Sequence, residues 1–154
     1  MDQYNIRKAN VSDFPVILQM IKELADYELS LDKVINNVEI MQQEQELFGC
    51  FIAADSESLE VIGIALYFFA YYTWVGKSLY LEDLYVKPDH RNKGVGTSLL
   101  EHIFKLAKSE DCRRLRWQVL HWNESAINLY KKLGAKVDKE WYNCDFDYEQ
   151  IKHS

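Results

Sequence analysis

The stretch Val86-Lys87-Pro88-Asp89-His90-Arg91-Asn92-Lys93-Gly94-Val95-Gly96-Thr97 is the most informative part of this 154-residue chain. An apolar strand pattern ends where the stretch begins, and a helix pattern begins at its glycines. The turn between them has the form Arg91-x-x-Gly94-x-Gly96. Glycine lets the backbone approach a ligand closely, and a helix start offers unpaired N–H groups and a positive dipole end. The turn therefore suits a pyrophosphate, although taken alone it fits an ordinary helix start equally well.

The turn differs from two common nucleotide-binding loops. A Walker loop ends in Gly-Lys-Ser/Thr, which is absent here. A dinucleotide-binding loop needs a third glycine, and Leu99 stands at that position.

A second motif lies at residues 123–135, which read Asn-Glu-Ser-Ala-Ile-Asn-Leu-Tyr-Lys-Lys-Leu-Gly-Ala. The pattern predicts a short helix that ends at Gly134. Together the two motifs resemble those of the Gcn5-related N-acetyltransferase (GNAT) superfamily. Its cofactor motif is Arg/Gln-x-x-Gly-x-Gly/Ala, and its later motif is Asn-x-x-Ala-x-x-Leu/Phe-Tyr-x-x-x-Gly-Phe/Ala. Their order and separation also match, and the resemblance covers nearly the whole chain.

Three further segments narrow the resemblance to the spermidine/spermine and thialysine N-acetyltransferase branch. These segments are residues 21–28, 71–86 and 119–124. The chain is shorter than the animal polyamine enzymes between Met41 and Ile62, and residues 141–151 match only loosely. Because those regions help to shape the amine site, the acceptor is less defined than the reaction.

The resemblance implies a fold, a cosubstrate and a reaction. The expected fold is a mixed α/β domain over residues 1–154, with a mostly antiparallel central sheet flanked by helices and acetyl-CoA at a splayed strand pair. The expected reaction is direct acetyl transfer, in a ternary complex, to a primary amine of a polyamine or diamine, or of a thialysine- or lysine-like amino acid. The family's cofactor-binding positions correspond to Leu84, Tyr85, Val86, Arg91, Asn92, Lys93, Gly94, Val95, Gly96, Thr97, Asn123 and Tyr130.

Two adjacent acids, Glu82 and Asp83, interrupt an otherwise apolar strand. Strand alternation predicts that they point to opposite faces of the sheet. An alkylamine has a pKa of ~10.4, so its deprotonation at pH 7 costs ~4.6 kcal/mol, which a general base lessens. With the resemblance, Glu82 is expected as that base, acting through water, and Asp83 as the contact to a second cationic centre. A structural salt bridge to Lys77 or Arg116 is the alternative for either acid.

Three further residues take roles from the resemblance. Tyr130 occupies the family's general-acid position and would protonate the departing thiolate, whereas a lone tyrosine there would be an ordinary core residue. Asn123 either caps its helix or forms a hydrogen bond with the pantetheine arm.

Trp74, in the aromatic run from Tyr67 to Trp74, is expected either to line the amine pocket or simply to pack. The length of this run, with the branch's dimeric state, predicts a homodimer.

Composition limits the remaining possibilities. A net charge of −6 disfavours nucleic acid and is compatible with a cationic substrate. Neither a membrane-spanning run nor a signal-peptide pattern is present, which predicts a cytoplasmic protein. The three cysteines and four histidines show no metal-ligand spacing, so no metal is expected.

Two rival functions remain: a non-catalytic acetyl-CoA sensor or interaction module, and an acetyltransferase for protein N-termini or lysines.

Hydrophobic periodicity predicts the order of elements. Ser12 is expected to cap the first helix, whose apolar stripe runs from Val16 to Leu24. Further helices are expected over residues 32–46, 94–108 and 124–133. Strands are expected over residues 4–8, 48–54, 61–70, 78–86, 114–120, 135–137 and 141–148.

Overall fold

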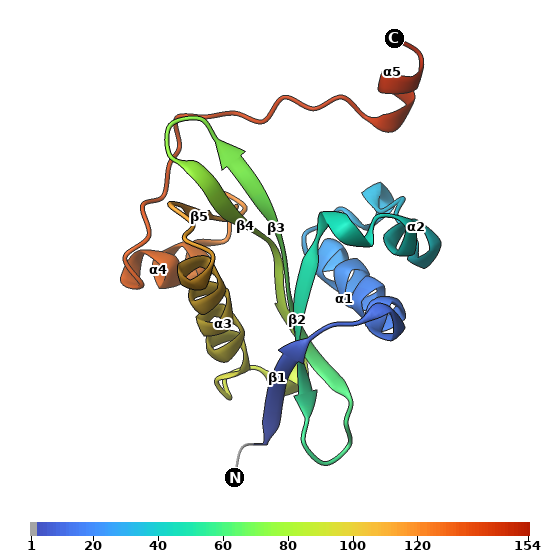
Figure 1. Ribbon diagram of the computed structural model, residues 1–154, viewed down its shortest axis with the longest axis vertical. Helices are drawn as coiled ribbons and strands as arrows, with labels where there is room; N and C mark the ends of the chain where they lie inside the picture. The colour runs from blue at the N-terminus through green and yellow to red at the C-terminus, as the bar shows by residue number, and fades with distance from the viewer. Residues whose placement is uncertain (1–2) are drawn as a thin grey trace. The chain divides into compact units, whose positions relative to one another are not determined.

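Five strands form one mixed sheet in the order β1-β2-β3-β4-β5 (Figure 1), in a computed structural model that describes residues 3–154. Neighbouring strands are antiparallel from β1 to β4, whereas β5 runs parallel to β4. The described chain forms two units, one reaching to Gln118 and one from Val119 to Ser154. The strands are β1 (Tyr4–Lys8), β2 (Gly49–Asp55), β3 (Val61–Tyr72), β4 (Gly76–Val86) and β5 (Leu115–Arg116).

Helices cover both faces of the sheet in the first unit. Helices α1 (Phe14–Tyr27) and α2 (Val38–Gln43) lie on one side, called here the α1 face, and α3 (Val95–Ser109) lies on the other, the α3 face (Figure 1). Each face has its own buried core, because strand side chains alternate between faces. The α1-face core includes Ile17, Met20, Ile52, Ile64, Leu66 and Tyr85. The α3-face core includes Ala53, Ala65, Tyr67, Leu79, Leu81, Leu99 and Ile103.

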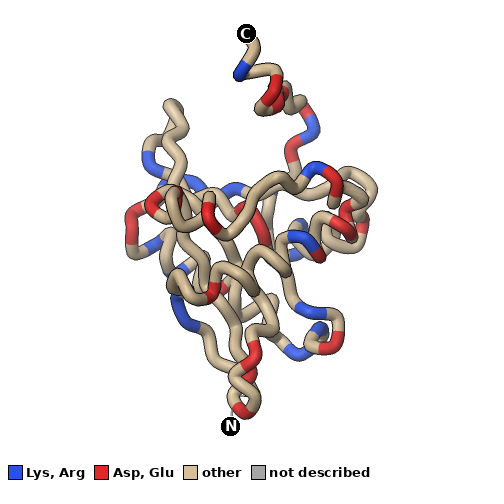
Figure 2. The backbone as a smooth tube through the Cα atoms, turned by 90° about the vertical axis from the view of Figure 1, so that its right-hand side faces the viewer, with Lys and Arg blue, Asp and Glu red and all other residues tan. Residues whose placement is uncertain are grey.

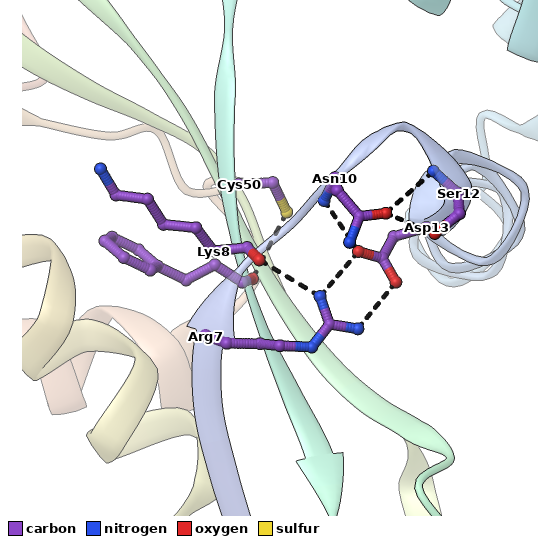
Figure 3. Close-up of polar contacts among 7 residues, drawn as sticks. Arg7, Lys8, Asn10, Ser12, Asp13 and Cys50 are labelled. Carbon is purple, nitrogen blue, oxygen red and sulfur yellow. Dashed lines mark hydrogen bonds and ion pairs between the residues drawn. The ribbon is translucent and has the colours of Figure 1, made fainter.

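The link from β1 into α1 corrects the predicted helix start. Ser12 is not the cap: the amide oxygen of Asn10 accepts the Ser12 N–H at 3.0 Å and opens a 3-10 turn at Val11–Asp13. The Asn10 N–H donates in return to the Asp13 carboxylate at 2.8 Å, which completes a capping box. Arg7 of β1 donates two hydrogen bonds to the same carboxylate, at 2.8 and 2.9 Å (Figure 3). The cap therefore lies before Pro15, and this bidentate pair ties the sheet to the helix.

The single helix predicted over residues 32–46 is wrong. The segment forms a 3-10 turn at Leu31–Lys33, the short α2, and a second 3-10 turn at Gln45–Leu47. Asn37 interrupts the helix because its side chain accepts the Ile40 N–H at 2.9 Å and caps α2 there.

The predicted strands after α3 are mostly absent. The strand expected over residues 114–120 is reduced to β5, and residues 135–137 and 141–148 form no strand. A strand needs a partner edge, which the alternating pattern of these residues cannot supply by itself. The second unit instead contains α4 (Glu124–Lys132) and α5 (Tyr148–Lys152). Asp147 and Gln150 form a capping box that starts α5 within the last predicted strand.

Candidate active site

A β-bulge in β4 places Glu82 and Asp83 on one face of the sheet. In the β3–β4 register, Leu66 pairs with Asp83 and Tyr67 pairs with Leu81, so Glu82 is an extra residue with no partner. Such an extra residue breaks the alternation of side chains along the strand. The prediction that the two acids point to opposite faces is therefore wrong.

The neighbours of the two acids identify the face. Leu81 belongs to the α3-face core and Leu84, three residues later, packs against that same core. The residues between them are therefore turned to the α1 face. Asp83 lies opposite Leu66, a member of the α1-face core, and residues paired directly across a sheet share a face.

Helix α1 adds two acids to this surface. Glu28, at the C-terminal end of α1, has its pKa raised by burial and then by the charge of Glu82. Burial, followed by the charges of Glu82 and Glu28, raises the pKa of Asp83 to about 7. Burial also raises the pKa of Glu82. Glu23 contributes a buried Oε2 with no hydrogen-bond partner among residues 3–154, and its charge raises the pKa of Tyr85.

These four acids form no ion pair within the described residues, and burial raises the pKa of three of them, Glu28, Glu82 and Asp83. Acidic and basic residues are interspersed along most of the chain (Figure 2), and several of them pair. The ion pairs within residues 3–154 are Arg7–Asp13, Lys77–Glu110, Lys87–Glu60, Arg113–Asp111 and His153–Glu149. None of them includes Glu23, Glu28, Glu82 or Asp83. Because carboxylates are costly to bury unpaired, this acidic cluster is suited to a cationic ligand.

The turn before α3 has the geometry that a pyrophosphate needs. Gly94 has a left-handed backbone, with φ of 82°, and Asn92 has φ of 61°. The first hydrogen bond of the helix runs from the Ser98 N–H to the Gly94 carbonyl at 3.0 Å, so the preceding N–H groups have no partner within the helix. Arg91 is held by a hydrogen bond from its Nε to the Val86 carbonyl at 2.9 Å. The residues present therefore fit a bound pyrophosphate.

The edge of β4 is open beside this turn. The parallel pairing of β4 with β5 covers only Leu79 and Tyr80. From Leu81 to Val86, β4 has no partner on that side within the described residues, although it remains paired to β3. An extended ligand can thus pair with the backbone of Leu84, Tyr85 and Val86, as expected for a splayed strand pair.

The second unit contains the other two expected residues. Asn123 caps α4, since its amide oxygen accepts the Ala126 N–H at 3.3 Å. Tyr130 is half-buried in α4, and burial raises its pKa. Its hydroxyl therefore remains protonated at neutral pH, as a proton donor must.

Residues 13–135 match the sequence profile of the acetyltransferase (GNAT) family. The chain belongs to this family. It is 36% identical to a thialysine N-epsilon-acetyltransferase of Sus scrofa, over 96% of this chain and 94% of that protein. It is 32% identical to the human spermidine/spermine N(1)-acetyltransferase-like protein 1, over 98% of this chain and 24% of that protein. Among solved structures, an integron cassette protein of V. cholerae superimposes with a TM-score of 0.76 at 21% identity, covering 99% and 98% of the two chains.

Most of the GNAT positions predicted in the first unit lie on β4, in the turn that follows it and at the start of α3. Trp74 is the exception. It is 83% exposed in the turn between β3 and β4, so it does not pack in the core. Glu82 lies six positions after Gly76, which is beside that turn, and this spacing corresponds to roughly 20 Å of strand. The structure therefore does not bring Trp74 beside the acids of its own chain.

Sequence reasoning assigned no role to Glu23 and Glu28. Both belong to a segment already noted for its resemblance, but their placement against β4 depends on how α1 packs. Within residues 3–154, no helix is long and apolar enough to cross a bilayer, and no group of three acidic, His or Cys side chains is arranged to hold a metal.

Proposed function

We propose that this GNAT protein transfers the acetyl group of acetyl-CoA to a primary amine of a small cationic acceptor. The acceptor is a polyamine or diamine, or a thialysine- or lysine-like amino acid. The observation that carries the proposal is the unpaired acidic cluster around the β4 bulge, on the strand that leads into the pyrophosphate turn. The names of the two relatives include both acceptor classes, a thialysine and a polyamine enzyme.

Glu82 acts as the general base. It is the more exposed of the two adjacent acids, so a water molecule can reach it and relay the proton from the amine. Its raised pKa brings it closer to the working pH, where a base is most effective. Asp83, together with Glu28, holds a second cationic centre of the acceptor.

Tyr130 acts as the general acid by giving its hydroxyl proton to the departing thiolate, whose conjugate acid has a pKa near ~8.5. Acetyl-CoA supplies the activated thioester when bound. The backbone of Leu84, Tyr85 and Val86 and the side-chain amide of Asn123 hold its pantetheine arm. The pyrophosphate is held by Arg91, Asn92, Lys93, Gly94, Val95, Gly96 and Thr97.

Transfer is direct, within a ternary complex. A covalent intermediate on Cys50 would need its thiolate, and burial raises the pKa of that thiol to about 12. Burial also raises the pKa of Cys112. Neither thiol is therefore activated as a nucleophile.

We place the enzyme in the cytoplasm as one N-acetyltransferase domain that forms a homodimer. Phe69, Tyr71 and Trp74 are 47%, 78% and 83% exposed at the β3–β4 end of the sheet. Neighbouring exposed aromatics of this kind are typical of an interface. We expect Trp74 to form part of this interface. Acetyl transfer from acetyl-CoA to a panel of amines tests the proposed function.

A further inference from the structure

Two arginines stack on one tyrosine at the edge of the sheet. The guanidinium carbons of Arg114 and Arg116 lie 4.9 and 4.7 Å from the ring centroid of Tyr72. Neither arginine forms an ion pair with any carboxylate within residues 3–154, whereas Arg113 beside them lies 3.7 Å from Asp111. Two positive charges are thus held together by stacking, which leaves their hydrogen-bond donors available to an anion.

This pair of arginines lies on the same face as the acidic cluster. Arg116 is paired in register with Tyr80 of β4, and Tyr80 is stacked on Phe68 with ring centroids 4.9 Å apart. Leu79 and Leu81, on either side of Tyr80, both belong to the α3-face core, so Tyr80 points to the α1 face. Side chains alternate along β3, and Tyr72 is six residues after Leu66, so both point to the α1 face.

Tyr80 lies between the two charged groups. Burial is the largest cause that raises the pKa of the Tyr80 hydroxyl to about 12. The charges of Glu82 and Asp83 also raise this pKa, whereas the charge of Arg116 lowers it. Glu82 is two residues farther along β4 than Tyr80, and Arg116 is one strand across. Strand geometry therefore separates their Cα atoms by roughly 8 Å. Glu82 and Arg116 thus start from neighbouring backbone positions on one face, and the guanidinium group of Arg116 extends to the ring of Tyr72.

The geometry points to a carboxylate subsite formed by Arg114 and Arg116, which selects amino acids with a distal primary amine over diamines and polyamines. This inference rests on the proposed function, because it assumes that the amine lies at Glu82 and Asp83. The carboxylate of such an amino acid reaches the guanidinium groups, which bind carboxylates in a forked geometry. A diamine or polyamine offers these arginines no anionic acceptor, and no carboxylate offsets the charge of its second ammonium group.

Calorimetric titration of the full-length protein with two ligands tests this inference. L-lysine and cadaverine differ only by the carboxylate, so their comparison isolates the subsite. We expect lysine to bind the unsubstituted protein about tenfold more tightly than cadaverine, as a charge-assisted contact provides. Arg116→Gln and Arg114→Gln should each remove about tenfold from lysine affinity and leave cadaverine within about twofold.

Arg113→Gln is the matched control, because it removes the neighbouring arginine that is not stacked on Tyr72. It should change neither affinity. Any of three results would overturn the subsite. The unsubstituted protein could bind lysine and cadaverine equally, Arg116→Gln could lose the same affinity for both, or neither ligand could bind. Because this experiment measures binding and not acetyl transfer, it tests the subsite separately from the proposed function. Lysine can show the expected binding when no acetyl transfer is detected, and the expected binding can be absent when acetyl transfer is detected.

Discussion

Asp83 lies on the same face of the sheet as Glu82, its neighbour in β4, because Glu82 is the extra residue of a β-bulge. Their carboxylates therefore repel, and the charge of Glu28 from α1 adds to the effect. The fold thus concentrates negative charge where no cation of the described chain pairs with it, and this has consequences for stability.

Asp83→Asn should stabilise the protein at pH 8. The native pKa of Asp83 is raised from 3.8 to about 7, so between these values the native state binds more protons than the unfolded state. The free energy of unfolding therefore falls as the pH rises through this window. Removing the charge should raise that free energy by about 1–3 kcal/mol at pH 8 and change it little near pH 4. Urea unfolding at both pH values measures the difference.

Asp13→Asn is the matched control, because it should change the free energy of unfolding in the opposite direction. Arg7 lowers the pKa of Asp13, so the stability that this pair contributes is present above the unfolded pKa and is lost as the pH falls. Asp13→Asn should therefore destabilise the protein at pH 8. A lower stability of Asp83→Asn at pH 8 would show that Asp83 makes a favourable contact.

Gly94→Asp should lower the affinity for acetyl-CoA by about 100-fold or more, because it adds a negative charge where the pyrophosphate would lie. It also adds a side chain at a φ of 82°. Gly76→Asp controls for backbone strain, since Gly76, the first residue of β4, has a φ of 91°. Calorimetry on both folded variants makes the comparison. Undiminished affinity in Gly94→Asp would remove the turn from the cofactor site.

Tyr130→Phe should lower turnover by about 10²–10⁴-fold, the contribution expected of a general acid. Acetyl-CoA affinity should change little, because only a hydroxyl is removed. Tyr148→Phe, an exposed tyrosine at the start of α5, is the control and should leave turnover unchanged. Single-turnover kinetics separates chemistry from product release, and an unchanged chemical step in Tyr130→Phe would exclude the hydroxyl from it.

Light scattering at micromolar concentration should give about twice the chain mass of 18.2 kDa. Tyr71→Ser with Trp74→Ser should shift the protein toward the monomer, because the pair removes exposed apolar surface at the β3–β4 end. Leu59→Ser is the control, since Leu59 is 74% exposed in the opposite turn, between β2 and β3. A monomer in the unsubstituted protein would contradict the homodimer.

Elements with a strong local pattern were predictable from the sequence. The β2–β3 hairpin, β4 and α3 lie close to their expected positions, because alternation or helical spacing specifies each of them. The turn from Arg91 to Thr97 was likewise predictable from the sequence, since its glycines and the start of its helix are local features.

Features that depend on pairing were not predictable. The β4 bulge exists only in the register of Asp83 against Leu66, so simple alternation gave the wrong face for one of the two acids. Residues 141–148 alternate like a strand but form none, because a strand depends on a partner edge. Glu28 became part of the candidate site only through the packing of α1 against the sheet.

We infer that the acidic cluster binds an amine and that Glu82 deprotonates this amine for acetyl transfer. Mass spectrometry of lysine, thialysine, cadaverine and spermidine, each incubated with acetyl-CoA, tests it most directly when free CoA is measured in parallel. We expect acetylated amine and CoA in equal amounts. Glu82→Gln should lower kcat/KM by about 10²–10⁴-fold and shift the pH profile upward, since more of the amine must arrive deprotonated. Acetyl-CoA binding without an acetylated amine, or an unshifted pH profile with normal turnover in Glu82→Gln, would contradict the claim.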